Sequence, residues 1–462
     1  MKKIIVSALA LIGLCFSLSQ VLAYDTSSPE LKIYNANTLR LNKGFFAYDK
    51  NFKGGASVAF AKLDDSNNNF IITGAGYGGG PQVKIFDKFG NEKYSFMAFS
   101  SNFKGGVNVS AGDVNKDGYD EIICSQASSG QAWIKVYDKT GKKVISNFLA
   151  FSSGFKGGAN VASGDINGDK KDEIIVGAGY GGGPQVRVFN KKGNPIFSSY
   201  PFAFDYKGGV NVASGDVDND LKDEIIASQA SEGQAWVKVF KANKDVTVLG
   251  NFLAYDSKFK GGATVSAIDV NNDKKAEVIT GAGFGGGPQV KVFTASGNSL
   301  GKDFFAFDQN YKGGINVASG KLTNTGKNKI LASVASYKGE RGNYPYQKYI
   351  EVDISEQWLK YFQDGRKIGY SLASTGNYGT DTPLGTFFIF SKRLSVRMSG
   401  PGYDLPGVPY VLSFLGPYTI HGTYWHSNFG HRMSHGCVNL PTPFAAQVYN
   451  WADIGTPVVI HS

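Results

Sequence analysis

A four-residue signature, Phe or Tyr followed by Lys-Gly-Gly, returns along the first two thirds of the chain and limits its fold more than any other feature. Successive copies begin 51, 52, 51, 53 and 52 residues apart. Self-similarity at a nearly fixed period indicates one supersecondary unit that stacks against its own copies. The copies begin at Phe52, Phe103, Phe155, Tyr206, Phe259 and Tyr311.

Each unit contains four short apolar or alternating runs separated by Gly, Asn, Asp and Lys. No stretch of the unit shows the hydrophobic periodicity of a helix. Four short strands per repeat are typical of a β-propeller blade. In the unit that begins at Phe155, the predicted strands are Ala159–Ser163, Glu173–Val176, Gln185–Phe189 and Tyr200–Phe204.

The two ends of the repeat region complement each other. The segment LKIYNANTLRLNKGFFAYDKN, from Leu31, aligns without a gap with VKVFTASGNSLGKDFFAFDQN, from Val290, which covers the third and fourth strands of a unit. The last unit supplies only the first two strands, within residues 311–336. We therefore expect a mostly β protein with a six-bladed propeller whose N-terminal strands complete the last blade and remove free sheet edges. An open β-solenoid is the alternative.

The first residues have the pattern of a secretory signal peptide. Lys2 and Lys3 precede a short apolar run, and small residues end at Ala23, where we expect cleavage. An uncleaved membrane anchor is the alternative, and Leu14 before Cys15 argues against a lipid anchor. The expected domains are a signal peptide at 1–23, the propeller at 24–346 and a smaller, mostly β domain at 347–462, with a helix at Pro443–Ala452.

Charge and cysteine usage agree with export to the periplasm or the cell-wall and extracellular face. The formal net charge is +10 and dispersed, which favours contact with anionic cell-wall polymers over a nucleic-acid site. No membrane span is expected after signal cleavage. After signal cleavage two cysteines far apart in the sequence remain, and they do not form a disulfide framework. Cys124 lies in a predicted core strand, whereas Cys437 has no such explanation.

Acidic residues at alternate positions fill the turn between the first two strands of four units. Oxygen side chains spaced in this way suit Ca²⁺, although the flanking helices and the last Glu of an EF-hand are missing. Solvated Asx turns are the alternative. The predicted ligands are Asp113, Asn115, Asp117, Asp120, Asp165, Asn167, Asp169, Asp172, Asp216, Asp218, Asp220, Asp223, Asp269, Asn271 and Asp273. Over about residues 30–336 the units resemble FG-GAP or VCBS repeats of extracellular propellers, which implies a binding or spacer module.

Four of the five histidines fall close to Cys437, between residues 421 and 435. A zinc site is one interpretation, but the spacings fit no helix face and would leave the Gly-Cys turn unexplained. A purely structural cluster is another. A cysteine activated by a histidine explains more, because a thiolate is the nucleophile and a histidine can take its proton.

The run Ser434-His435-Gly436-Cys437-Val438-Asn439, preceded by His421, resembles the L,D-transpeptidase catalytic domain of the YkuD family. Further matches are IEVDISEQWL, STG, TPLGTF and IHGTYWH, over about residues 347–462. The resemblance implies that Cys437 is the nucleophile, that His421 is the proton donor and acceptor, and that His435 assists. The same resemblance gives the oxyanion and substrate environment to Ser434, Gly436 and Asn439.

The implied reaction is acyl transfer between peptidoglycan stem peptides, giving 3→3 cross-links through a Cys437 thioester, with no cofactor for catalysis. An L,D-carboxypeptidase on the same scaffold and a calcium-dependent cell-wall adhesin are the alternatives. His426 and His431 are expected to be polar loop residues, and His461 to lie at the surface near the C-terminus.

Overall fold

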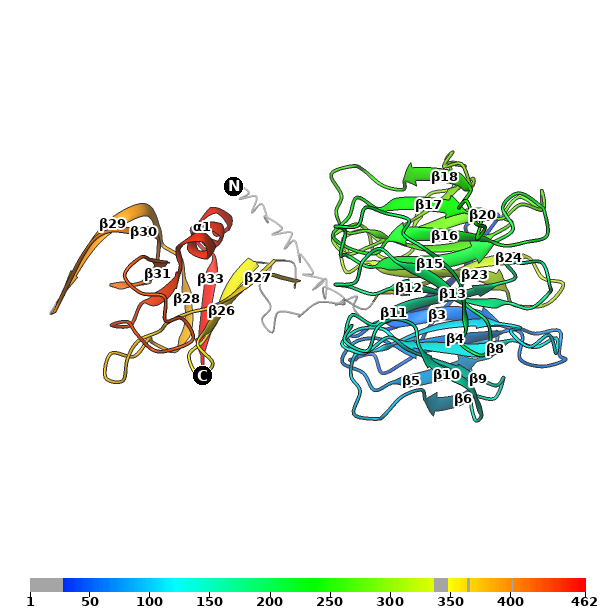
Figure 1. Cartoon of the computed structure of the whole chain (residues 1–462), viewed down its shortest axis with the longest axis horizontal. Helices are drawn as coiled ribbons and strands as arrows, with labels where there is room; N and C mark the ends of the chain where they lie inside the picture. The colour runs from blue at the N-terminus through cyan, green and yellow to red at the C-terminus, as the bar shows by residue number, and fades with distance from the viewer. Residues whose placement is uncertain (1–27, 336–347, 364–365, 401) are drawn as a thin grey trace, which may run out of the picture.

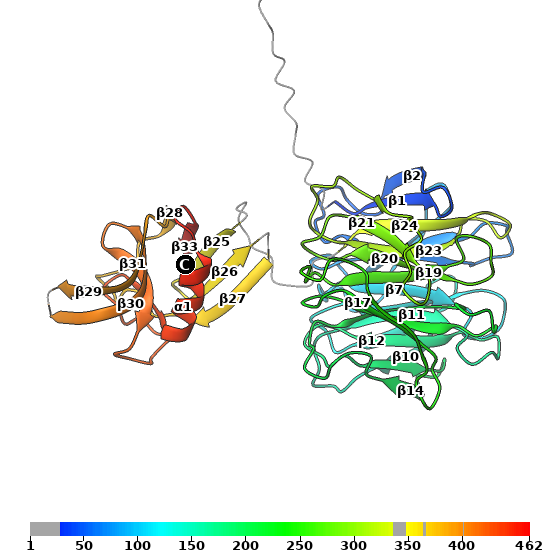
Figure 2. The same cartoon turned by 90° about the horizontal axis from the view of Figure 1, so that it is seen from above.

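The computed structural model describes residues 28–335, 348–363, 366–400 and 402–462, and it is almost entirely β (Figures 1 and 2). The predicted signal peptide and the expected boundary at 346/347 lie outside the described residues.

Six four-stranded antiparallel sheets make up the region before residue 335, and five of them follow chain order. The first three are β3 (Ala56–Ala61), β4 (Phe70–Ala75), β5 (Gln82–Phe86), β6 (Glu92–Met97); β7 (Val107–Gly112), β8 (Glu121–Gln126), β9 (Trp133–Tyr137), β10 (Val144–Leu149); and β11 (Ala159–Gly164), β12 (Glu173–Ala178), β13 (Val186–Phe189), β14 (Pro195–Ser199). The next two are β15 (Val210–Gly215), β16 (Glu224–Gln229), β17 (Trp236–Phe240), β18 (Val248–Leu253); and β19 (Ala263–Ile268), β20 (Glu277–Ala282), β21 (Gln289–Phe293), β22 (Phe304–Phe305).

The sixth sheet joins both ends of the region. Its order is β2-β1-β24-β23, from β1 (Glu30–Asn35), β2 (Leu41–Phe46), β23 (Ile315–Lys321) and β24 (Asn328–Val334). β1 pairs antiparallel with β24 from Leu31↔Ser333 to Asn35↔Lys329. The predicted completion of the last blade by the N-terminal strands is confirmed.

The first strand of each sheet contacts the first strands of its two neighbours, and β23 contacts β3, which closes the ring. Side-chain amides tie the neighbours together: Asn160 Nδ2 donates to the Val210 carbonyl, and Asn316 Nδ2 donates to that of Ala56, both at 2.7 Å. The second bond joins the last repeat unit to the first, where the ring closes. The six sheets therefore form a six-bladed propeller, and the open solenoid is excluded.

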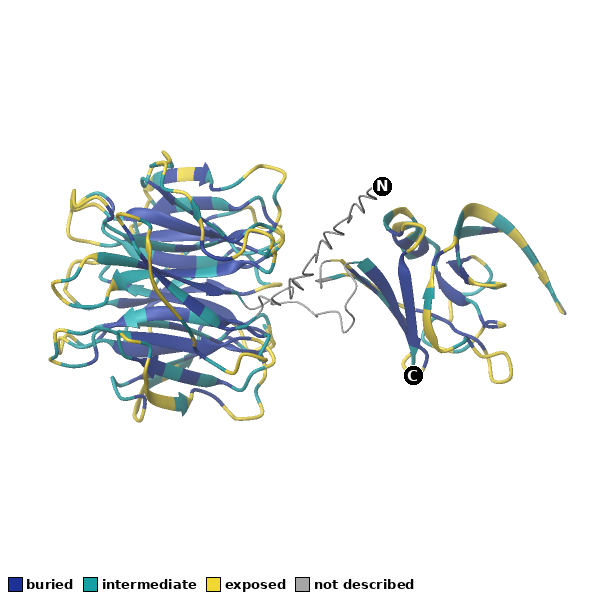
Figure 3. Ribbon diagram, turned by 180° about the vertical axis from the view of Figure 1, so that it is seen from behind, coloured by how far each residue is buried: buried dark blue, intermediate teal, exposed yellow. Residues whose placement is uncertain are grey.

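Within a blade, burial falls from the inner strands to the outer edge (Figure 3). All residues of β12 are buried, whereas the outermost β14 is mostly exposed. The fourth strand predicted at Tyr200–Phe204 is wrong, because Gly193, at φ +81°, turns the chain early and the strand is Pro195–Ser199. Phe202 instead packs against the core between two blades.

Among the described residues from 348 to 462 there are two sheets and one helix. One sheet has the order β27-β26-β25-β33-β28, from β25 (Lys348–Asp353), β26 (Trp358–Gln363), β27 (Arg366–Leu372), β28 (Gly385–Phe388) and β33 (Pro457–His461). The other is β29 (Ser391–Gly400), β30 (Tyr403–Leu415), β31 (Tyr418–Thr423) and β32 (Val438–Pro441). The helix predicted at Pro443–Ala452 is α1 (Thr442–Trp451).

The core of this part lies between α1 and the two sheets, with Ile350, Leu359, Ile420 and Val448 among its fully buried side chains. Of the helices in the described ranges, none combines the length and apolar character that a bilayer crossing requires.

Candidate active site

The parallel pairing of β31 with β32 brings the predicted nucleophile and base to one sheet face. His421 is opposite Asn439 in the ladder, and Cys437 lies one residue before β32. Side chains two residues apart on a strand share a face, so Thr419 and His421 on β31 face Cys437 and Asn439. The Thr419 hydroxyl lies 3.5 Å from the Cys437 sulfur.

His421 is held as a neutral ring in one tautomer. It is 2% exposed, and its Nδ1–H donates to the Gly422 carbonyl oxygen at 3.0 Å. Nε2 then carries the lone pair. Burial lowers the pKa of His421 to about 4, and the nearby His426 ring adds to this, while the Gly422 carbonyl opposes it. The ring is therefore a proton acceptor at neutral pH.

Cys437 is a partly exposed free thiol. Burial raises its pKa above the ordinary value, while the Thr419 hydroxyl and backbone N–H act in the opposite direction. The partners of the thiol among the described residues are Thr419 and, at 3.9 Å, the Pro417 carbonyl. Both members of the pair are thus neutral at rest, and the thiol must give up its proton during the reaction.

The turn before Cys437 is fixed by short polar bonds. The Ser434 hydroxyl donates to the Cys437 carbonyl at 2.6 Å and accepts the Gly436 N–H at 3.1 Å. The buried Thr382 of TPLGTF donates its hydroxyl to the Gly436 carbonyl at 2.9 Å. Gly436 has φ +111°, and a Cβ there would lie 2.4 Å from the Tyr418 ring. Ser434 and Gly436 therefore position the nucleophile, and the Gly436 N–H is already hydrogen bonded.

The STG segment supports the same turn from the other side. The backbones of Ser374 and Asn439 exchange two hydrogen bonds of 2.9 Å. The Thr375 carbonyl accepts the N–H groups of Met433 and Ser434, both at 3.0 Å. The STG segment thus holds the turn through backbone hydrogen bonds, and the TPLGTF segment holds it through the Thr382 hydroxyl.

His426 is a site residue that sequence reasoning missed. Its Nε2 lies 3.0 Å from the amide nitrogen of Asn439, whose amide oxygen is buried without a hydrogen-bond partner. Asn428 N–H donates to His426 Nδ1 at 3.3 Å, so Nε2 carries the proton and the amide oxygen of Asn439 is its natural acceptor. The available signal was its place five residues after His421.

The other histidines lie farther out. His435 is exposed and stacks on Tyr403 of β30, with ring centroids 4.9 Å apart, so it connects the turn to the β29–β30 hairpin. His431 is exposed. His461 ends β33 with its side chain 33% exposed, which agrees with the expectation of a surface residue, and its Nε2 lies 3.0 Å from the buried Glu351 carboxylate. Among the described residues, the side chains close enough together to share a metal ion are Asp216, Asp218 and Glu224 of the propeller, and none of these histidines belongs to the group.

The four acidic turns, called acid loops here, are 113–121, 165–173, 216–224 and 269–277. In each, the first acid accepts backbone N–H groups of its own turn. Asp113, for example, accepts those of Lys116, Asp117 and Gly118 at 2.5, 3.1 and 2.8 Å. The first acids Asp165, Asp216 and Asp269 repeat this arrangement.

The fourth predicted calcium ligand of a loop does not lie with the other predicted ligands of that loop. Asp172 and Asp223 turn toward the preceding blade, where their N–H groups bond the Asp113 and Asp165 carbonyls at 3.0 and 2.8 Å. Asp120 likewise accepts the Lys62 N–H at 2.7 Å. The next residue of each loop points inward instead and is almost fully buried. These glutamates, which sequence reasoning missed, are Glu121, Glu173, Glu224 and Glu277.

Comparison with known proteins finds a family match within each part of the chain. Residues 347–460 match the model of the L,D-transpeptidase catalytic domain, YkuD, and residues 113–176 match that of the FG-GAP-like repeat. A probable L,D-transpeptidase 3 of Mycobacterium tuberculosis is 32% identical over 104 residues, which are 20% of this chain and 38% of that protein. The chain thus spans well under half the length of this curated relative.

Solved structures of similar sequence include the catalytic domain of an Enterococcus faecium L,D-transpeptidase, at 28% identity. The match covers 26% of this chain and 100% of that one, with a TM-score of 0.24. A crystal structure of a variant of an L,D-transpeptidase from that organism is 27% identical, covering 25% of this chain and 50% of that one, with a TM-score of 0.24. By its sequence, therefore, the part at residues 347–460 is similar to the L,D-transpeptidase catalytic domain, YkuD, and residues 113–176 of the propeller are similar to the FG-GAP-like repeat.

Proposed function

We propose that this chain is an exported L,D-transpeptidase that forms 3→3 cross-links in peptidoglycan through a Cys437 thioester. The observation that carries the proposal is the pairing of β31 with β32, which sets the neutral His421 ring and the Cys437 thiol on one face. The match of residues 347–460 to the family supports the substrate class.

In the first step Cys437 gives its proton to His421 Nε2, and its sulfur attacks the carbonyl carbon of the third residue of a tetrapeptide stem. The C–S bond forms, and the amide C–N bond breaks as His421 returns the proton to the departing D-amino acid. In the second step the side-chain amine of another stem attacks the thioester. The new amide C–N bond forms and the C–S bond breaks, with the Cys437 sulfur as leaving group. His421 takes the amine proton and returns it to that sulfur, so the free enzyme is restored.

Purified protein incubated with a defined tetrapeptide stem tests the proposal. We expect a mass adduct of one tripeptide acyl group on Cys437, followed by cross-linked dimers. Release of tripeptide alone in the presence of excess acceptor would instead assign an L,D-carboxypeptidase. Absence of both the adduct and the products would contradict the thioester route.

We propose further that the propeller binds Ca²⁺ at acid loops and holds the enzyme near anionic wall polymers. The residues that fit a hard cation are the first, third and fifth residues of a loop together with its glutamate. Glu121 and Glu173 are 2% and 5% exposed, and one carboxylate oxygen of each has no hydrogen-bond partner. A bound Ca²⁺ would neutralise and join these oxygen ligands.

A further inference from the structure

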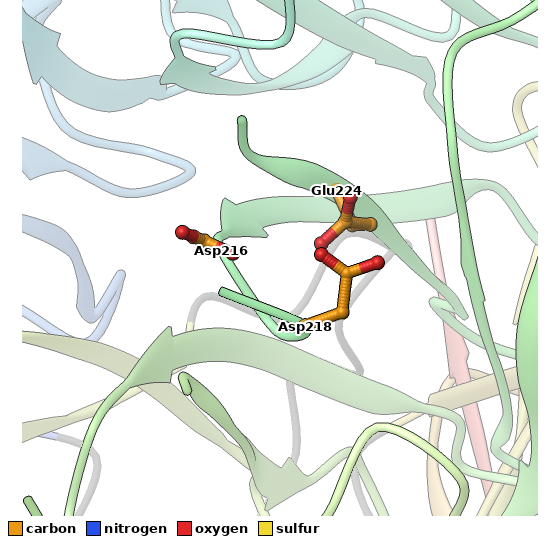
Figure 4. Close-up of side chains that lie close together, drawn as sticks. All are labelled: Asp216, Asp218 and Glu224. Atoms are coloured by element: carbon orange, nitrogen blue, oxygen red, sulfur yellow. The ribbon is translucent and has the colours of Figure 1, made fainter. Parts of the chain in front are cut away.

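One acid loop has an ammonium group against three of its carboxylates, whereas in the loop 165–173 the Lys171 ammonium lies 3.8 Å from Asp169 alone. In the loop 216–224, the ammonium group of Lys241 lies 2.6 Å from a carboxylate oxygen of Asp218 and 2.6 Å from one of Asp220. It also lies 3.6 Å from the buried Glu224 carboxylate. Figure 4 shows that Asp218 and Glu224 point toward each other, with Asp216 beside them. Lys241 therefore sits against the carboxylates that would ligate a metal ion.

Lys241 directly follows the third strand of its blade, β17. The corresponding residues of the other three blades with acid loops are Asp138, Asn190 and Thr294, after β9, β13 and β21. None of these three is basic. Asp138 and Asn190 instead accept N–H groups of their own hairpins. The lysine is thus a property of one blade.

The partners of the loop glutamates also differ between the blades. In the loop 269–277, which has no lysine at the corresponding position, Glu277 accepts the Val270 N–H and the Asn271 amide, both at 2.8 Å. In the loop 216–224, Glu224 has Lys241 beside one oxygen and accepts the Val217 N–H at the other, at 3.0 Å. In the loop 113–121, Glu121 accepts the Asn115 amide at 2.6 Å through one oxygen, and its other oxygen is unpaired. Val114 N–H, beside that carboxyl, donates to the Gly112 carbonyl at 3.0 Å. Glu173 repeats this arrangement with Asn167, at 2.8 Å.

We propose that Lys241 is a built-in substitute for the divalent cation in the loop 216–224, whereas the loops 113–121 and 165–173 take a cation from solution. The reason is electrostatic. An ammonium held against three carboxylates supplies positive charge where a cation would bind, and a divalent ion would have to displace it. The inference rests on the calcium proposal above, and it assigns the blades different roles within it.

The test counts bound calcium in the full-length protein after chelator treatment, by isothermal titration and by mass spectrometry under native conditions. Lys241→Asn introduces the residue that the neighbouring blade carries at position 190. We expect this variant to bind one more Ca²⁺ than the wild type. The added Asp218→Asn change should remove that extra ion. Lys244→Gln, which removes an exposed charge three residues away, should leave the count unchanged.

Two substitutions in the wild-type background test the inference even if Lys241→Asn folds poorly. Glu121→Gln should lower the count by one, and Asp218→Asn should leave it unchanged. An equal count for wild type and a folded Lys241→Asn, or a loss on Asp218→Asn alone, would overturn the inference while calcium binding stands. If the wild type binds no calcium, the calcium proposal fails, and this inference fails with it.

Discussion

The neutral state of the Cys437–His421 pair governs how the site responds to pH. Burial raises the pKa of the thiol and lowers that of the imidazole to about 4, so each change favours the uncharged form. In such a site the thiol loses its proton during the attack, and the resting site contains a thiol rather than a thiolate.

This arrangement predicts a low acid limit for acylation. His421 must be neutral to accept the proton, so the rate is lost only as pH falls through about 4. Acylation by a stem peptide should stay level down to about pH 5.5, since protonation of a base matters only near its pKa. Iodoacetamide labelling of Cys437 should instead keep rising with pH through the neutral range, because burial raises the pKa of the thiol and the thiolate fraction grows with pH below that pKa. Rapid labelling that is already level at pH 6 would reveal a resting thiolate and contradict the neutral pair.

Substitution of the nucleophile gives the sharpest loss. Cys437→Ala should abolish the acyl adduct and all cross-linking, and Cys437→Ser should be nearly inert because a hydroxyl is a far poorer nucleophile. Mass spectrometry of the protein after incubation with donor stem measures the adduct. An unchanged circular dichroism spectrum is the control for folding, and an adduct on the Ala variant would refute the mechanism.

His426 should act through Asn439 and His421 as a positioning residue. In His426→Ala the Asn439 amide loses its hydrogen-bond partner, and an unpaired buried polar group costs about 1–3 kcal/mol. If the transition state carries this cost, the acylation rate falls about tenfold or more. The ring also helps to lower the pKa of His421, so its removal should move the acid limit upward. Exposed His431→Ala is the matched control. A rate loss without a shifted acid limit would leave His426 a merely structural role.

At the scale of elements, the turn 434–437 depends on a backbone conformation that favours glycine. Gly436→Ala would combine φ +111° with a clash against the Tyr418 ring, and strain of this kind costs about 1–3 kcal/mol. We expect lower thermal stability of residues 348–462 and a large fall in acylation, because the turn carries Cys437. Gly379→Ala is the control, since that glycine also has a positive φ but open space around it. Equal activity losses in the two variants would remove the clash as the cause.

The repeat and the motif allowed most of the elements to be predicted, because both are local patterns. The shared blade was predictable because Leu31 and Val290 begin alignable segments. The outer strand was misplaced because the aromatic run at Tyr200–Phe204 looks like a strand but packs between blades. His426 and the loop glutamates were missed because their roles arise from side-chain direction: Asp120 and Glu121 are adjacent yet face different blades.

For the whole molecule, calcium should stabilise the propeller and leave the catalytic domain unchanged. A cation that binds the folded loops and not the open chain raises the melting temperature with its concentration. We expect two transitions in calorimetry, of which the propeller's moves with calcium. Magnesium at equal ionic strength is the control for screening. If chelator leaves both transitions in place, the acid loops are solvated turns.

The sixth blade has a consequence for the order of events as the chain folds during synthesis. β1 finds its partner β24 about three hundred residues later along the chain, since Leu31 pairs with Ser333. Contacts of such sequence separation form late, because a long loop must close before they repay its entropy. The strands that emerge first must therefore wait with an unsatisfied edge until nearly the whole ring has followed. During that interval the unpaired strand edge can pair with another copy of the chain. The folding yield should therefore fall as protein concentration rises, whereas the closed ring has no such edge and should not associate in this way.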